Sequence, residues 1–329
     1  MSLPRGNETA HAAFATAMAG GSLHHAWLFA GPEGVGKGSF ARIAAARLLA
    51  EAAGEDDLPP GFDLPEESRT ARLLAAGSHP DYRELVRLPK DPDKPDQDLA
   101  RGIKIEQVRA LQPMFATQPS MGPRRVVVID AVDDLERGGA NALLKNLEEP
   151  PAGTIFLLTS HAPGRLLPTI RSRCRLLRFE GLVDDAMAAI VRDALPEASL
   201  DEISALVRAG QGSPGRALGF AGLDIAALDR AMATISAQGD RDNAERVKLS
   251  RALALKAAQP RYEAFLDRAP AFIAATARTR QGEALRRALD AHDAARDLAS
   301  AARGLSLDAQ GTVFEMAGIV ARLAPDNRG

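Results

Sequence analysis

The residues best suited to bind a ligand are the glycines and the lysine between positions 31 and 39. Residues 31–37 read Gly-Pro-Glu-Gly-Val-Gly-Lys, after an apolar run and before an amphipathic one. The glycines let backbone amides turn inward around a phosphate, Lys37 supplies a positive charge, and the helix N-terminus adds its dipole. The segment therefore predicts a strand, a phosphate-binding loop (P-loop) and a helix. We expect nucleotide contacts from Gly31, Gly34, Val35, Gly36, Lys37, Gly38 and Ser39.

The predicted loop lacks the group that places a magnesium ion. A P-loop ordinarily carries Ser or Thr directly after its lysine, because that hydroxyl ligates the metal, and this sequence has Gly38. Ser39 follows one position too late to be assumed a substitute. The sequence thus predicts phosphate binding with incomplete metal positioning, and a glycine-rich turn that binds no ligand is the alternative.

Two further strands end in polar residues that can face the same nucleotide. Residues 126–130, Val-Val-Val-Ile-Asp, are typical of a strand buried on both faces of a parallel sheet. Asp130 then takes the Walker B position, which holds magnesium, although a core strand ending in a solvated aspartate is the alternative. Ala131 stands where an ATPase needs a glutamate to polarise the attacking water. The strand expected at 154–160 ends near Thr159, whose hydroxyl can sense a γ-phosphate or cap a turn.

The elements that must position these residues are of two kinds. Strands and helices alternate up to about residue 180, which predicts an α/β fold with a parallel sheet. After Gly181 the strand patterns end, and Ser199 to Glu202 forms a helix-capping pattern. The apolar spacing of the last third predicts helices over 225–237, 244–257, 262–266, 272–277, 283–302 and 306–324.

The composition narrows the function classes. A net charge of −2 gives no overall basic field, so any DNA contact must be local or shared with partner subunits. The single cysteine, Cys174, can build neither a disulfide framework nor a thiolate zinc site, and it fits a reducing cytosol. The start shows no signal-peptide pattern and no apolar run is as long as a membrane span. We therefore expect a cytoplasmic protein without membrane contact.

Three motifs in this order resemble the AAA+ subunits of the bacterial DNA polymerase III clamp loader. They are the P-loop, the run Asn-Ala-Leu-Leu-Lys-Asn-Leu-Glu-Glu-Pro-Pro at 141–151, and Ser-Arg-Cys at 172–174. The resemblance spans roughly residues 22–220. It implies an AAA+ RecA-like P-loop domain (1–180), a small helical lid (181–222) and an all-α collar for oligomerisation (223–329). The periodicities agree with this division, although they do not show it.

The resemblance also implies roles for two arginines. Arg173 would be an arginine finger that reaches the ATP site of the neighbouring subunit and neutralises charge on the transferred phosphate. The alternative is a solvated basic patch over 171–178. Arg216 resembles the lid residue called sensor 2, which would touch a nucleotide bound in its own subunit. Together with Lys37 it could hold ATP or ADP without hydrolysis.

Departures from the family pattern point to a member that does not hydrolyse ATP. The motor subunits, gamma and tau, keep both groups that Gly38 and Ala131 replace here. Many relatives also hold zinc with four cysteines, whereas residues 51–78 contain none, so no zinc is expected and His79 is interpreted as a loop or capping residue.

We expect a stator with negligible ATPase activity of its own. Its implied partners are the gamma/tau motor subunits, the delta subunit, the sliding clamp and the phosphates of primed DNA. One alternative is a gamma/tau-type ATPase in which Ser39 and Asp133 or Asp134 replace the missing groups. Another is a P-loop regulatory or nucleic-acid-binding module outside replication.

Overall fold

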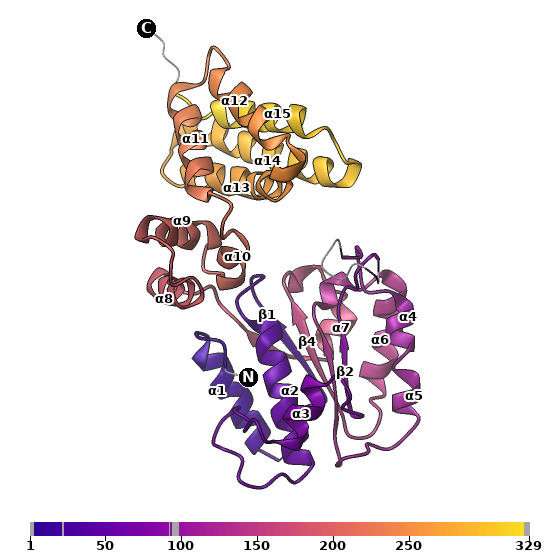
Figure 1. Cartoon of the computed structure of the whole chain (residues 1–329). Helices are drawn as coiled ribbons and strands as arrows, with labels where there is room; N and C mark the ends of the chain where they lie inside the picture. The colour runs from indigo at the N-terminus through magenta and orange to yellow at the C-terminus, as the bar shows by residue number, and fades with distance from the viewer. Residues whose placement is uncertain (1–2, 22, 92, 94–98, 326–329) are drawn as a thin grey trace. The chain divides into compact units, whose positions relative to one another are not determined.

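The computed structural model describes residues 3–21, 23–91, 93 and 99–325 (Figure 1). The chain divides into two compact units. The first contains the residues up to 190 together with 212–215, and the second contains 191–211 together with the residues from 216 onward. The three domain boundaries expected from the sequence stay a prediction.

The first unit is built on a five-stranded parallel sheet with the strand order β2-β3-β4-β1-β5. Its strands are β1 (Ala26–Ala30), β2 (Tyr82–Leu85), β3 (Arg125–Ile129), β4 (Thr154–Ser160) and β5 (Arg175–Arg178). Because all pairs are parallel, the carboxyl ends of β1, β3 and β4 meet at one edge of the sheet. The expected α/β fold with a parallel sheet is confirmed, and the P-loop, Asp130 and Thr159 share that edge.

Helices cover both faces of the sheet (Figure 1). One face packs against α1 (Glu8–Ala19), α2 (Lys37–Ala52) and α3 (Arg69–Ala75), and the other against α4 (Ile105–Arg109), α5 (Gln112–Phe115), α6 (Arg137–Glu148) and α7 (Pro168–Ser172). Along β3, Val126 and Val128 belong to the first core, whereas Val127 and Ile129 belong to the second. This alternation explains why the strand is apolar throughout: both of its faces are buried.

The segment between α2 and β2 is tied down by polar side chains. Arg47 donates to Glu51 at 2.8 Å and to the carbonyl oxygen of Pro59 at 2.5 Å. Glu55 accepts from the Ser68 hydroxyl at 2.6 Å and from the N–H of residue 70 at 2.7 Å. These bonds close the segment onto α2. His79, just beyond it, is buried and accepts from the Asp81 N–H at 3.2 Å, which fits the turn role expected of it.

The second unit consists of helices throughout its described residues. After α8 (Asp184–Ala194), which begins in the first unit, come α9 (Leu200–Gly210), α10 (Pro214–Gly219), α11 (Ile225–Gln238), α12 (Ala244–Leu253), α13 (Gln259–Ala277), α14 (Gly282–Leu305) and α15 (Ala309–Ala321). The expected cap of α9 is present, since the Ser199 hydroxyl accepts from the Glu202 N–H at 3.2 Å. The expected all-helical C-terminal region is confirmed.

One prediction in this region is wrong. The sequence predicts separate helices at 262–266 and 272–277, but α13 runs unbroken through Pro270. A proline inside a helix costs about 3 kcal/mol because it removes one backbone hydrogen bond. Phe265 and Ile273, on either side of it, are completely buried, so the packing of one continuous face offsets that cost.

The last helix also begins later than predicted. Its expected start at 306 is replaced by Asp308, whose carboxylate accepts from the Gly311 N–H at 2.6 Å and caps α15. Among the helices of the described ranges, none is long and apolar enough to cross a membrane.

Candidate nucleotide-binding site

The P-loop joins the end of β1 to the start of α2. Gly34 and Gly36 adopt φ angles of 76° and 96°, which side chains rarely tolerate, and Val35 between them is buried in the core. The loop is therefore anchored while its backbone turns in front of the helix N-terminus. A cavity of about 390 Å³ lies there, with Gly34, Gly36, Lys37, Gly38, Ser39 and Asp130 among its lining residues.

The ammonium group of Lys37 is held inside this loop. Lys37 is 2% exposed, and its Nζ donates to the carbonyl oxygens of Gly31 at 2.8 Å and Pro32 at 2.5 Å. Burial lowers the pKa of Lys37 to about 8, although the nearby Asp130 and Glu33 oppose the shift. At neutral pH the lysine thus remains a cation, and its two carbonyl partners can be exchanged for phosphate oxygens. The residues present fit a bound nucleotide phosphate.

Asp130 meets a protein cation at the position expected for Walker B. Its Oδ1 accepts from the Thr159 hydroxyl at 2.6 Å, and its Oδ2 accepts from the Arg42 guanidinium at 3.1 Å. Arg42 lies on α2, and Nε of the same side chain donates to Glu84 on β2 at 2.7 Å. Burial alone would lower the pKa of the Arg42 guanidinium, but the carboxylates of Glu84 and Asp130 outweigh burial. The pKa of Arg42 therefore lies above its ordinary value. Both oxygens of Asp130 are therefore engaged by the protein itself.

A magnesium ion does not fit this arrangement. A Cβ atom added to Gly38 would lie 2.0 Å from Oδ2 of Asp130, so the carboxylate occupies the space beside residue 38 where the metal-binding hydroxyl would begin. No group of three or more acidic, histidine or cysteine side chains suited to a metal occurs in the part of the chain that is described.

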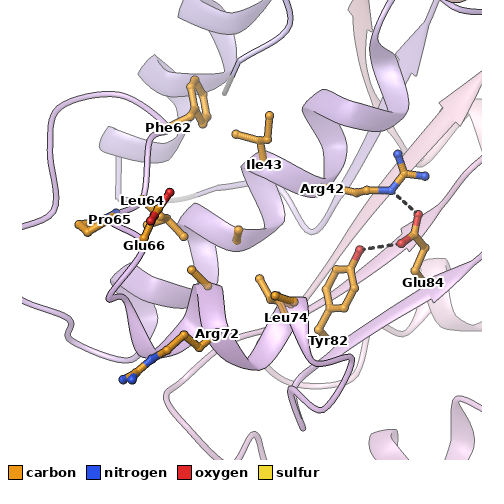
Figure 2. A pocket seen from close by; sticks show the side chains of 13 residues that line it. Arg42, Ile43, Phe62, Leu64, Pro65, Glu66, Arg72, Leu74, Tyr82 and Glu84 are labelled. Carbon is orange, nitrogen blue, oxygen red and sulfur yellow. Dashed lines mark hydrogen bonds and ion pairs between the residues drawn. The ribbon is translucent and has the colours of Figure 1, made fainter. Parts of the chain in front are cut away.

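Figure 2 shows Arg42 at the end of a second cavity, of about 470 Å³, between α2, α3 and β2. Its walls are mostly apolar and include Phe62 and Leu74. Glu84 accepts there from the Tyr82 hydroxyl at 3.2 Å, and burial raises the pKa of that hydroxyl. Arg42 lines both cavities and stands between them.

The two aspartates after Ala131 have structural partners. Asp133 accepts from the Ser160 hydroxyl at 3.0 Å and from the backbone N–H groups of residues 161 and 162 at 2.8 and 3.0 Å. Asp134 forms an ion pair with Arg87 at 3.1 Å, while burial raises the pKa of its carboxyl group. Asp133 thus fastens the turn after β4, and neither carboxylate stands without a partner.

Arg173 lies at the C-terminal end of α7, away from its own P-loop cavity. Its guanidinium pairs with Glu148, the last residue of α6, at 2.7 Å and donates to the Thr169 carbonyl oxygen at 2.9 Å. The pair is partly exposed, with side-chain accessibilities of 34% for Arg173 and 48% for Glu148. The Asn-Ala-Leu-Leu and Ser-Arg-Cys motifs therefore meet in space through this ion pair.

The segment before Arg216 contacts the P-loop. Ser213 donates from its hydroxyl to the Glu33 carbonyl oxygen at 2.6 Å, and the Gly215 N–H donates to the Gly34 carbonyl oxygen at 2.9 Å. Arg216 itself belongs to the second unit, where its guanidinium lies 5.8 Å from the centre of the Phe220 ring. Its contact with nucleotide stays a prediction.

Sequence reasoning missed Arg42 and Glu84. Their signal is weak: Glu84 is a charged residue in a short strand, and Arg42 follows Gly38 by one helical turn. Neither residue type nor spacing reveals that Arg42 bridges Glu84 and Asp130.

Comparison with known proteins gives the same family as the motifs. The family model described as "DNA polymerase III, delta subunit" matches residues 6–183. The chain is 37% identical over 192 residues to DNA polymerase III subunit delta' of Pseudomonas aeruginosa, which is 58% of this chain and 53% of that protein. It is 33% identical over 198 residues to subunit delta' of Escherichia coli, covering 60% and 54%.

A tau subunit is also similar. DNA polymerase III subunit tau of Salmonella typhimurium is 33% identical over 233 residues, which cover 70% of this chain and 34% of that protein. The chain spans about half the length of the delta' proteins it matches, and about a third of tau.

Proposed function

The chain belongs to the family described as DNA polymerase III, delta subunit, and from this we propose that it serves as the delta' subunit of a bacterial clamp loader. In this role it is an AAA+ stator: it completes the loader ring and helps to place the sliding clamp on primed DNA. The observation that carries the proposal is a contrast between two sites. The groups for ATP hydrolysis in the chain's own site are replaced or engaged, while Arg173 stands at the surface in a weak ion pair.

The chain's own site holds nucleotide without hydrolysing it. Lys37 and the P-loop amides bind the phosphates of ATP or ADP, with Arg216 as a further contact. Hydrolysis also needs a positioned water and a base. Ala131 carries no base, and Asp133 is bonded to the turn after β4.

Arg173 acts in the site of the neighbouring motor subunit. A partly exposed ion pair contributes about 0–1 kcal/mol, so Arg173 can leave Glu148 for a phosphate at little cost. A guanidinium at the transferred phosphate stabilises its developing charge and accelerates related reactions by about three to five decades. The hydrogen bond to Thr169 keeps the guanidinium near the end of α7 in the meantime.

The remaining partners follow from this role. We expect the chain to assemble with gamma or tau motor subunits and the delta subunit, and to reach the clamp through that complex. Its DNA contacts are salt-dependent and indifferent to base sequence because they are made to phosphates.

A gamma/tau-type motor is the second candidate. Lys37 is retained, and the similarity to tau extends over 70% of the chain. This candidate requires turnover by the isolated chain that disappears in Lys37→Ala. The partners of Asp133 and Asp134 speak against it, because both carboxylates would have to leave them.

Assembly tests the proposed role without relying on catalysis. The full chain is mixed with motor and delta subunits of the same bacterium, and the complex is measured by native mass spectrometry. We expect one copy of the chain per ring. If the chain stays apart from the motor and delta subunits, the stator role is wrong.

A further inference from the structure

We infer that the P-loop site of this chain binds a nucleoside di- or triphosphate without a divalent cation, with Arg42 in the charge-neutralising place of the metal. Arg42 is a positioning residue here: it acts on Asp130 and not on the nucleotide. The inference rests on the proposed nucleotide binding by Lys37 and the P-loop.

The first support is steric. Asp130 lies so near to the backbone of Gly38 that a Cβ there would meet its Oδ2 at 2.0 Å. Real Cβ contacts are essentially never this short, so Gly38 is what lets the carboxylate sit where it does. The absence of a hydroxyl at residue 38 thus removes one metal ligand. It also lets the Asp130 carboxylate, which would be a second metal ligand, occupy the space of that hydroxyl.

The second support is the charge balance around Asp130. Arg42 pairs with both Asp130 and Glu84, and Lys37 adds a further positive charge near Asp130. Glu84 and Asp130 hold Arg42 at 2.7 and 3.1 Å, so the aspartate's charge is cancelled by a group of the protein (Figure 2 shows the Glu84 side of this contact). In a metal-dependent site the ion itself does this.

The third support is the cost of admitting a metal. Asp130 would have to give up the Thr159 hydroxyl at 2.6 Å and the Arg42 guanidinium at 3.1 Å. Its side chain is 21% exposed and that of Arg42 is 35% exposed, so both charges are partly desolvated. Separating the pair leaves Arg42 with Glu84 as its remaining carboxylate partner, and a partly desolvated ion pair is more costly to break than one at a fully solvated surface. Magnesium, which loses its own water reluctantly, gains one carboxylate in return.

The test is the affinity of the full-length chain for ADP and for ATP, measured by calorimetry in excess magnesium and in excess EDTA. We expect the dissociation constants to agree within about twofold. Affinity that falls by about tenfold or more in EDTA overturns the inference, and so does the absence of nucleotide binding in both conditions.

A double variant should make nucleotide binding depend on magnesium. Gly38→Thr with Arg42→Ala restores the hydroxyl and frees Asp130, and its nucleotide affinity should become at least about tenfold stronger in magnesium than in EDTA. Arg42→Ala alone frees Asp130 but restores no hydroxyl at position 38, so its affinity should gain less from magnesium than that of the double variant. Arg72→Ala, an exposed arginine that also lines the second cavity, is the matched control and should behave like the wild type.

Folding of each variant is checked by thermal unfolding, and the wild-type comparison decides the matter even if the double variant does not fold. Failure of this inference differs from failure of the proposed role. Magnesium-dependent binding by a chain that still assembles with the motor subunits overturns only the inference. Magnesium-independent binding by a chain that does not assemble overturns only the role.

Discussion

Arg42 and Arg173 belong to the same unit and their side chains are about equally exposed, at 35% and 34%, but their partners differ. Arg42 is held between Glu84 and Asp130 at the nucleotide edge of the sheet, whereas Arg173 pairs with Glu148 at the surface, where almost half of the glutamate side chain is exposed. The first arginine satisfies a carboxylate that a motor would use for metal. The second has a partner that is easily exchanged. In the proposed role, this difference would let one chain give up hydrolysis in its own site and still supply a charge to another.

The largest effect should come from Arg173→Ala in the reconstituted loader. ATP turnover at the site that Arg173 serves should fall by about three decades, because the charge on the transferred phosphate loses its guanidinium. Single-turnover phosphate release measures it. Arg175→Ala is the control, since Arg175 is an exposed arginine two residues away on β5. Equal rates in the two variants would remove the distinction between Arg173 and the surrounding basic patch.

Loss of the hydrogen bond between Thr159 and Asp130 should lower the stability of the protein. Thr159→Val removes the hydrogen bond to Asp130 at almost unchanged volume, and we expect a loss of about 2 kcal/mol in the free energy of unfolding, since bonds to charged groups contribute more than neutral ones. Urea denaturation measures this loss.

The matched control for that change is Thr154→Val, at the start of the same strand. The buried Thr154 hydroxyl has no hydrogen-bond partner among the residues that the structure describes, so this change should be neutral or stabilising. An equal loss in both variants would mean that Asp130 gains nothing from Thr159.

The pH dependence of nucleotide binding should follow Lys37. Burial lowers its pKa from 10.5 to about 8 in the free protein, so the neutral amine dominates above that pH. Phosphate favours the ammonium form; binding must then take up a proton, and affinity weakens by up to about tenfold per pH unit above pH 8. Below pH 8 the affinity should be nearly constant.

Calorimetry in two buffers of different ionisation enthalpy detects the proton uptake by Lys37. Lys37→Arg keeps its charge throughout and should give a flat profile. A wild-type profile that is also flat would contradict the combination of a lowered Lys37 pKa and a contact of Lys37 with phosphate.

The smallest effect should be that of Glu148→Gln. It removes the surface partner of Arg173, and the free energy of unfolding should change by less than about 1 kcal/mol. Thermal unfolding of the isolated chain measures it. A loss several times larger would show that Arg173 is a structural element of the α6–α7 corner and is not readily available to a neighbour.

The sequence predicts the sheet and its polar edge well, because both signals are local. The β-branched run before Asp130 and the glycines before Lys37 each lie within a few residues. The contact between Arg42 and Asp130 joins residues 88 positions apart, and no local pattern encodes it. Gly38 could be recognised as a missing hydroxyl, but the carboxylate that fills its space is visible only in three dimensions.

The helical region shows the same limit. Pro270 is a correct local signal for a break, yet α13 continues because Phe265 and Ile273 pack on a shared core. Tertiary burial outweighs a local preference there. The Ser-Arg-Cys pattern in the sequence indicates Arg173 as a candidate residue, whereas its ion pair with Glu148 is visible only in the folded structure.

The central claim is tested most directly by ATP hydrolysis, first by the purified chain alone and then after addition of the motor and delta subunits, clamp and primed DNA. We predict no turnover above background by the chain alone, and turnover in the mixture that depends on Arg173. Hydrolysis by the isolated chain that is lost in Lys37→Ala would contradict the account and identify the chain as a motor.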